Sequence, residues 1–187
     1  YHPEVEGTMG QLPEGSIYLV ETIKDISELN FYEDDKIAYV TQTTLSVDDT
    51  QDMIAELRNK FPNIESSPKE DICYATSNRQ NAIKEYANKC DAFIVVGSKN
   101  SSNSNRLVEV AKNAGCLNSY LLENAKSLNV SNYSSYNTIG ISSGASVPEV
   151  LVENVISKFQ ENYSLEIENV SLGEENVQFK LPKEVRN

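Results

Sequence analysis

The sequence predicts an α/β fold: tandem similar α/β domains, each a small, mainly parallel sheet flanked by helices. Short apolar runs alternate with longer segments of helical periodicity along the 187 residues, a pattern typical of parallel sheets with helices on both faces. The run Ala92–Val96 is continuously apolar, as in a strand buried on both faces. An internal echo is the third observation. Thr44–Asp49 and Gly144–Glu149 each place a serine three residues before an acidic residue, as in a capping box at a helix start.

In the first half, strands are predicted where β-branched and aromatic residues gather, and helices where apolar residues recur at helical spacing. The apolar positions of Val47–Phe61 fall on one helical face, so this segment is predicted to be an amphipathic helix. The other predicted elements are a strand at Ser16–Val20, a short helix at Ile23–Leu29 and a strand at Lys36–Thr41. Pro62 and Pro68 interrupt the pattern, so a domain boundary is placed at residue 68.

The second half repeats the alternation of strands and helices. Its predicted helices are Ala75–Lys89, Asn103–Ala114, a short one at Glu123–Leu128, and Ser146–Gln160 with an inner face of Val150, Leu151, Val155 and Phe159. Its predicted strands are Ala92–Val96, Leu117–Leu122 and Thr138–Ile141, followed by a strand or arm at Glu175–Leu181. We therefore expect one α/β domain, incomplete at its start, at 1–68, a second at 69–172 and a C-terminal arm at 173–187.

The charge balance narrows the classes of function. The chain has 16 Lys+Arg and 28 Asp+Glu, a net charge of −12, which argues against nucleic-acid or membrane-surface binding because both need a basic face. No run of about 18 apolar residues predicts a membrane span, and no signal-peptide pattern is visible. Three widely spaced cysteines, an odd number, indicate a reducing, cytoplasmic compartment rather than a disulfide framework.

The polar segment Gly97–Arg106 carries the clearest chemical signal. It is rich in Ser and Asn, contains two basic residues and no acidic one, and lies between a buried strand and a helix, where open α/β sheets bind ligands. Hydroxyls, amides and free N–H groups at a helix start can hold a phosphate or diphosphate. The alternative is an ordinary loop in which Ser102 or Asn103 only caps the helix. A cap accounts for one such residue rather than the whole run, so the anion site is favoured.

Two other loops occupy equivalent positions before helices. Ser146, in the loop Ser142–Ser146, is expected to be a helix N-cap, and contact of its hydroxyl with a ligand is the less favoured alternative. The threonines of Thr41–Thr44 are likewise expected to cap a helix rather than bind a ligand. Gly140–Gly144 fits the motif G-x-S-x-G, but a serine hydrolase needs a histidine after that serine, and the one histidine is His2. A serine hydrolase is therefore excluded.

His2, Glu4 and Cys73 are candidate reactive groups. In an extended chain His2 and Glu4 share a face, and a histidine beside a glutamate can bind an anion and deliver a proton; the alternative is a pair of solvated polar residues. Cys73 stands just before a predicted helix, whose dipole favours a thiolate able to ligate iron. A single cysteine is weak evidence for a metal. Cys90 and Cys116 have the character of buried structural thiols.

Taken together, five segments resemble the 4-hydroxy-3-methylbut-2-enyl diphosphate reductase family, the IspH or LytB enzymes. The resemblance extends in order over essentially all 187 residues, and the Ser/Asn-rich loop and the Thr-Gln-Thr-Thr-Leu-Ser motif are its most specific parts. The segments are His2–Thr8, Thr41–Asp48, Asp71–Gln80, Val96–Leu107 and Gly144–Ser146.

The resemblance implies a role for each matching residue. Cys73 matches a ligand of a 4Fe–4S cluster whose free iron takes the substrate's hydroxyl oxygen. Glu4 matches the proton donor, and Thr43 the hydroxyl that relays to the substrate. The residues that match the diphosphate-binding set are His2, Ser101, Ser102, Asn103 and Ser146.

The resemblance also implies a small allylic diphosphate substrate and a reductive dehydroxylation to isopentenyl and dimethylallyl diphosphate, the last step of the methylerythritol phosphate route. An electron donor such as ferredoxin or flavodoxin is implied as partner. The family's trefoil-like arrangement has three domains, and its N-terminal domain supplies two more cluster cysteines and two more diphosphate-binding histidines. This sequence begins at Tyr1, within the His-Pro-Glu motif, and is expected to be a fragment without that domain. Alone, it is either part of the reductase or a non-catalytic diphosphate-binding α/β module.

Overall fold

A computed structural model describes residues 3–32, 34–66, 72–172 and 185. The chain divides into two compact units. The first consists of Tyr1–Thr41 and Val47–Asp71, and the second of Gln42–Ser46 and Ile72–Asn187. Each unit contains its own small parallel sheet and its own helices, which confirms the predicted α/β class.

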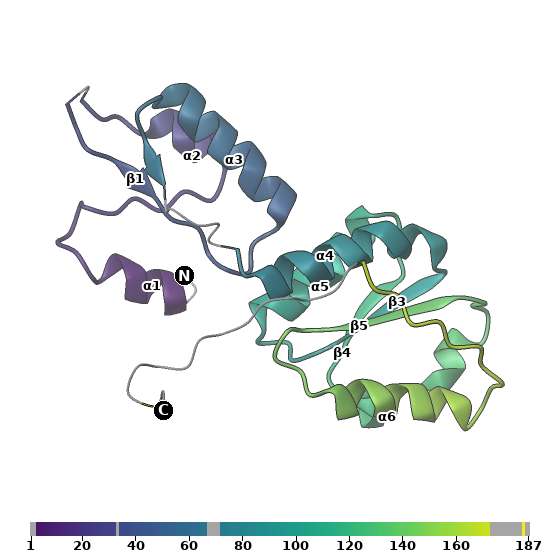
Figure 1. Cartoon of the computed structure of the whole chain (residues 1–187). Helices are drawn as coiled ribbons and strands as arrows, with labels where there is room; N and C mark the ends of the chain where they lie inside the picture. The colour runs from purple at the N-terminus through teal and green to yellow at the C-terminus, as the bar shows by residue number, and fades with distance from the viewer. Residues whose placement is uncertain (1–2, 33, 67–71, 173–184, 186–187) are drawn as a thin grey trace. The chain divides into compact units, whose positions relative to one another are not determined.

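The first unit is built around a two-stranded parallel sheet. Its elements are α1 (Pro3–Met9), α2 (Ile23–Glu28), β1 (Ala38–Tyr39), α3 (Val47–Lys60) and β2 (Glu65–Ser66), with β1 paired to β2 (Figure 1). The helices α2 and α3 were predicted within two residues of these bounds. Strand β1 is shorter than the predicted strand, and β2 was not predicted.

The strand predicted at Ser16–Val20 is wrong, because these residues form no strand. Their apolar character serves aromatic packing instead. The ring of Tyr18 meets Phe31 edge-on with centroids 5.3 Å apart, and Phe31 lies at the same centroid distance from Phe61 at the end of α3. Residues Ser16–Val20, although of types that favour strands, thus pack through a side chain and pair with no neighbouring strand.

Lys60 fastens the end of α2 to α3. Its ammonium group donates to the carbonyls of Ile26, Ser27 and Leu29 at 2.8, 2.7 and 2.7 Å. These carbonyls belong to the last turn of α2 and the residue after it, where a helix leaves acceptors without intrahelical partners; the Ile26 carbonyl also accepts from the Leu29 N–H. A cation there also opposes the negative end of the helix dipole.

Lys60→Met is therefore expected to lower the free energy of unfolding of the first unit by roughly 1.5–3 kcal/mol, the contribution of a hydrogen bond from a charged donor. Urea denaturation followed by circular dichroism measures the change. Lys24→Met is the matched control: it removes an exposed lysine of α2 whose partner Glu28 is 3.9 Å away, and exposed pairs contribute less than about 1 kcal/mol. Equal losses in the two variants would contradict the role assigned to Lys60.

The second unit contains a three-stranded parallel sheet in the order β4-β3-β5. The strands are β3 (Ala92–Val96), β4 (Ser119–Leu122) and β5 (Ile139–Ser143), and the helices are α4 (Tyr74–Tyr86), α5 (Ser102–Asn113) and α6 (Glu149–Gln160). Three short 3₁₀ helices complete it: η1 (Ala87–Lys89), η2 (Ala125–Ser127) and η3 (Val130–Tyr133). Figure 1 shows α4 and α5 on one face of the sheet and α6 on the other.

The central strand β3 explains why two cores form. All five of its residues are buried, and successive side chains point to opposite faces. Phe93 and Val95 pack with residues of α4 and α5, whereas Ile94 and Val96 pack with Val155 and other residues of α6. The continuous apolar run thus serves both layers, as the sequence predicted.

The last helix differs from its prediction at the N-terminus. It begins at Glu149 with Pro148 as N-cap, not at Ser146, because the residue before a proline is disfavoured in the helical region. Val150, predicted for the inner face, is 53% exposed, whereas Val155 and Phe159 are buried as predicted. The predicted strand or arm at Glu175–Leu181 lies outside the described residues.

Asp91 ties the starts of β3 and β5 together. Its carboxylate accepts from the N–H groups of Asn137 and Thr138 at 2.8 and 3.0 Å. The bond from Thr138, followed by that from Asn137, holds the pKa of Asp91 below its ordinary value, since both bonds favour the charged carboxylate.

The stabilisation from Asp91 therefore has a defined pH dependence. It is fully present above the pKa of an unfolded aspartate, about 3.9, and is lost as the pH falls through the lower pKa of the folded state. We expect Asp91→Asn to make unfolding less dependent on pH below about 4, whereas Glu153→Gln, at an exposed position of α6, leaves that dependence unchanged. Thermal melts across the acid range measure it; identical profiles for wild type and Asp91→Asn would contradict the assignment.

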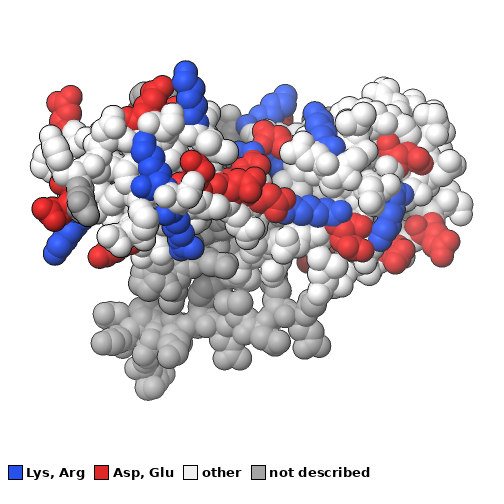
Figure 2. All heavy atoms as spheres, turned by 90° about the horizontal axis from the view of Figure 1, so that it is seen from above, with Lys and Arg blue, Asp and Glu red and all other residues white. Residues whose placement is uncertain are grey.

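Within the described ranges, no helix has the length and apolar character needed to cross a bilayer. The face of the molecule seen in Figure 2 carries basic side chains interspersed with acidic ones, and the described residues on that face form no extended basic patch.

Candidate functional site

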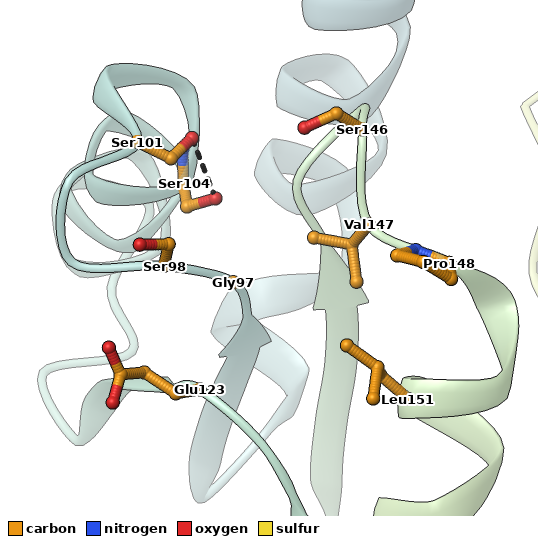
Figure 3. Close-up of a pocket in the computed structure, with 9 residues that line it drawn as sticks. All are labelled: Gly97, Ser98, Ser101, Ser104, Glu123, Ser146, Val147, Pro148 and Leu151. Atoms are coloured by element: carbon orange, nitrogen blue, oxygen red, sulfur yellow. Dashed lines mark hydrogen bonds between the residues drawn. The ribbon is translucent and has the colours of Figure 1, made fainter.

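The three strands of the second unit end around one cavity. Because β4, β3 and β5 are parallel, their carboxyl ends meet at one edge of the sheet, the usual ligand-binding edge of open α/β sheets. A cavity of about 250 Å³ opens there (Figure 3). It is lined by Gly97, Ser98, Ser101, Ser104, Glu123, Ser146, Val147, Pro148 and Leu151.

Ser101 is the N-cap of α5, and its hydroxyl is oriented by that role. Its Oγ accepts from the Ser104 N–H at 3.2 Å and from the Ser104 hydroxyl at 3.1 Å. A serine oxygen has two acceptor positions and one proton to donate. Because Ser104 takes up both acceptor positions, the Ser101 O–H remains for a ligand. Figure 3 shows this hydroxyl and that of Ser146 facing one another.

Ser104 is a site residue that the sequence analysis did not assign. It is 1% exposed and lies between Gly97, which follows β3, and Gly144, which follows β5. A Cβ atom at either glycine would collide with the Ser104 hydroxyl. The two glycines therefore let α5 approach the ends of both strands. The hydrogen bonds from Ser104 then fix the Ser101 hydroxyl at the cavity. The only sequence signal was a glycine directly after each of two strands.

Asn103 carries a polar atom without a partner. The residue is 9% exposed, and its Oδ1 is buried with no hydrogen-bond partner among the described residues. Buried polar atoms in proteins are nearly always paired, so an exception needs an explanation such as an absent ligand or water. Ser101, Ser102 and Asn103 are three of the five predicted diphosphate-binding residues, and they occupy the N-cap and the first two positions of α5, where N–H groups and the helix dipole favour an anion.

Ser146 lines the cavity and does not cap α6, so the predicted N-cap is wrong. Its hydroxyl is thereby left for the cavity, which favours the ligand-binding alternative. Glu123, at the end of β4, also lines the cavity and was not predicted. A carboxylate repels an anion, so a bound diphosphate is expected on the serine side of the cavity rather than beside Glu123.

Thr43 and Cys73 lie together at the N-terminus of α4. Cys73 is the N-cap residue, makes no side-chain capping bond and is exposed. Its N–H donates to the Thr43 carbonyl at 3.2 Å, and the Thr43 side chain is exposed. Because α4 leads into the start of β3 and α5 leads away from its end, both helices begin toward the carboxyl edge of the sheet.

The paired face predicted for His2 and Glu4 rested on an extended chain, and that premise is wrong from Pro3 onward. Pro3–Met9 forms the helix α1 and is not extended. His2 lies outside the described residues. Glu4 is exposed on α1 in the first unit, so its pairing with Thr43 of the second unit stays a prediction.

The cysteines differ in character, and only Cys73 suits a metal. Within the described residues, no group of three or more His, Cys, Asp and Glu side chains could hold a metal ion. Cys73 therefore fits a cluster as one ligand and not as a site by itself. Cys116 is buried and its thiol approaches the Cys90 carbonyl at 3.4 Å; burial is the main cause that raises the pKa of Cys90. Both have the character of structural thiols, as predicted.

Comparisons with known proteins agree on one family. A family model described as LytB protein matches residues 1–160. The 4-hydroxy-3-methylbut-2-enyl diphosphate reductases of Roseobacter denitrificans and Beijerinckia indica are 51% and 52% identical over 185 residues, which cover 99% of this chain and 58% of each relative. A solved structure of the E-1-hydroxy-2-methyl-but-2-enyl-4-diphosphate reductase from Plasmodium falciparum superposes with a TM-score of 0.84 at 38% identity, covering 98% of this chain and 57% of that one. The chain thus spans less than two thirds of these relatives.

Proposed function

The chain belongs to the LytB protein family, and from this premise we propose that it is the part of a 4-hydroxy-3-methylbut-2-enyl diphosphate reductase that binds the diphosphate and supplies one cluster ligand. The reaction takes up two electrons and two protons: one proton leaves with the allylic hydroxyl group as water, the other is added to carbon, and the products are isopentenyl and dimethylallyl diphosphate. The names of its relatives support this assignment. By full-length enzyme we mean a protein that contains this chain and also the region that its relatives have and this chain does not match.

The diphosphate binds at the start of α5. The observation that carries this proposal is the Ser101 hydroxyl, which lines the cavity and whose acceptor positions are both filled by Ser104, so that its O–H is left to donate to a ligand. Ser101, Ser102 and Ser146 donate to the phosphate oxygens, as does the side-chain amide nitrogen of Asn103. The buried Asn103 Oδ1 is an acceptor and takes its hydrogen bond from a ligand-bound water. His2 is a further donor in this proposal, on the resemblance alone.

Cys73 would hold one iron of a 4Fe–4S cluster, which would pass the two electrons from the donor to the substrate. Its exposure suits this role, and so does its place at the N-cap of α4, where its side chain makes no capping hydrogen bond. Further ligands come from the part of the relatives that this chain does not match. An electron carrier such as ferredoxin or flavodoxin serves as the donor.

Glu4 and Thr43 deliver the proton that leaves with the substrate's hydroxyl group. Hydroxide is a poor leaving group and departs readily only as water, so an acid must stand within hydrogen-bond reach of the leaving oxygen. Thr43, exposed beside Cys73, hydrogen-bonds the substrate hydroxyl, and Glu4 is the source of the proton. The Cys73 N–H bond to the Thr43 carbonyl supports a role for Thr43 near Cys73.

The second candidate is a non-catalytic diphosphate-binding module. One observation favours it: the described residues offer a single plausible iron ligand. Both candidate functions include the diphosphate site, but only the reductase binds an iron–sulfur cluster. Stoichiometric iron and sulfide in the full-length enzyme would support the reductase, and its absence after anaerobic reconstitution would support the module.

The diphosphate site is tested by calorimetric titration of the 187-residue chain with inorganic pyrophosphate. Ser101→Ala is expected to weaken binding about 10- to 100-fold, because a hydrogen bond to a charged oxygen contributes roughly 1.5–3 kcal/mol. Ser157→Ala, at an exposed position of α6 outside the cavity, is the matched control and should bind as wild type does. Equal affinity of Ser101→Ala and wild type would remove Ser101 from the site.

A further inference from the structure

The short segment Gln42–Ser46 packs in a different unit from the residues on either side of it in the sequence. The residues before and after Gln42–Ser46 belong to the first unit, whereas Gln42–Ser46 itself belongs to the second. Thr43 lies in this segment. The contacts that hold the segment therefore determine where the Thr43 hydroxyl stands relative to Cys73.

Two hydrogen bonds from α4 hold the segment. The Cys73 N–H donates to the Thr43 carbonyl at 3.2 Å, and Gln80 Nε2 donates to the Leu45 carbonyl at 2.8 Å. The first donor is the N-cap of α4, and the second is a side chain about two turns further along the helix. A single rigid element thus fixes the segment at two carbonyls.

Gln80 is an uncommon residue for the position it occupies. It is 0% exposed and lies on a buried stripe of α4 between Thr76 and Ile83. Ile83 belongs to the hydrophobic core, so an apolar side chain is the ordinary occupant of this stripe. Burying a primary amide is unfavourable unless it is hydrogen-bonded. A methionine would fill similar space but could not donate to the Leu45 carbonyl.

We propose that Gln80 is a positioning residue that clamps Gln42–Ser46 onto α4, so that the Thr43 hydroxyl and the Cys73 sulfur keep one fixed relation. This inference rests on the proposed roles of Thr43 and Cys73. Gln80 acts through the segment and touches neither substrate nor cluster. The expected effect is large for a remote residue, because a displacement of about 1 Å at a reacting group can cost about 100-fold in rate.

The clamp is tested first in the 187-residue chain, without cluster or substrate. Gln80→Met keeps the approximate volume and removes the donor. With Leu45 released, the Thr43 carbonyl no longer stays over the N-terminus of α4, and the Cys73 amide should exchange with deuterium about fivefold faster or more, as expected for the loss of one hydrogen bond. Exchange is followed by NMR.

Ile83→Val is the matched control. It lies on the same stripe and loosens the core but leaves the Gln80 amide in place. Faster Cys73 exchange in Gln80→Met alone supports the clamp; equal acceleration in both variants, or none, overturns it. Should Gln80→Met fail to fold, Gln80→Glu serves instead, because a carboxyl group donates only when protonated. Cys73 protection, corrected for intrinsic exchange, should then fall as the pH rises, and a protection independent of pH overturns the proposal.

The catalytic consequence is measured in the full-length enzyme. Gln80→Met should lower kcat about 10-fold while KM stays within about twofold, since an interaction that serves the transition state alone affects kcat; Ile83→Val should change neither. Normal turnover in a Gln80→Met enzyme with a released segment overturns the positioning role. Absence of reductase activity in the wild type would instead reject the proposed function, and the exchange experiment would still decide whether Gln80 clamps the segment.

Discussion

Cys73→Ser is expected to abolish both bound iron–sulfur and turnover in the full-length enzyme. Cys73 is the exposed thiol at the N-cap of α4, and a serine hydroxyl is a poor ligand for iron that thiolates otherwise hold. Iron and sulfide analysis, together with the visible absorption of the reconstituted protein, measures the cluster independently of activity.

Cys90→Ala is the matched control for the loss of a thiol. Cys90 is half-buried and its thiol donates to the Tyr86 carbonyl at 3.4 Å, so the variant should keep full iron content. Cys116→Ala should do the same, at some cost in stability because this side chain is buried. A Cys73→Ser enzyme with a complete cluster would show that other residues hold the iron.

Glu4→Gln should lower kcat by about 10²- to 10⁴-fold, the usual contribution of a positioned general acid, while substrate affinity and iron content stay near wild type. The substitution keeps the size of the side chain and its hydrogen bonds but removes the proton that accompanies the leaving hydroxyl. Single-turnover measurements with a reduced cluster separate this step from electron supply.

Glu6→Gln is the control for this change, since Glu6 is exposed on the same helix α1 and points away from Glu4. It should turn over as wild type does. If Glu4→Gln retained near-normal turnover, the proton would come from another group, such as the substrate's own diphosphate.

The fold was predicted best where one local pattern sufficed. The apolar run Ala92–Val96 is a strand with the predicted bounds, because burial on both faces leaves a signal in every residue. Ser16–Val20 carries the same residue types but forms no strand, since strand formation also needs a partner that the run cannot specify. A pattern in a single sequence records the burial of apolar residues but does not record the presence of a partner strand.

The site was predictable in its contiguous parts. Ser101, Ser102 and Asn103 are the N-cap and the first two residues of one helix, so their proximity follows from sequence alone. Ser104 and Glu123 were missed because their roles depend on packing between elements: a Cβ clash at two distant glycines for Ser104, and the meeting of strand ends for Glu123. The capping role predicted for Ser146 failed for a local reason, the proline two residues later.

The packing of Thr43 with the second unit could not be predicted from the sequence either. Nothing in the segment Gln42–Ser46 marks it as part of the second unit, and its attachment depends on Gln80, thirty-five positions away from Leu45. A glutamine at a position that helical spacing places on the buried stripe of α4, with Thr76 and Ile83, is the signal that could have indicated it.

The central claim is that this chain forms part of a reductase of an allylic diphosphate, and product analysis tests it most directly. The full-length enzyme, reconstituted with iron and sulfide under anaerobic conditions, is incubated with 4-hydroxy-3-methylbut-2-enyl diphosphate and a one-electron reductant. We expect isopentenyl and dimethylallyl diphosphate to appear with consumption of two electrons per substrate. A protein that carries the cluster and binds the substrate yet leaves its hydroxyl group in place would contradict the claim.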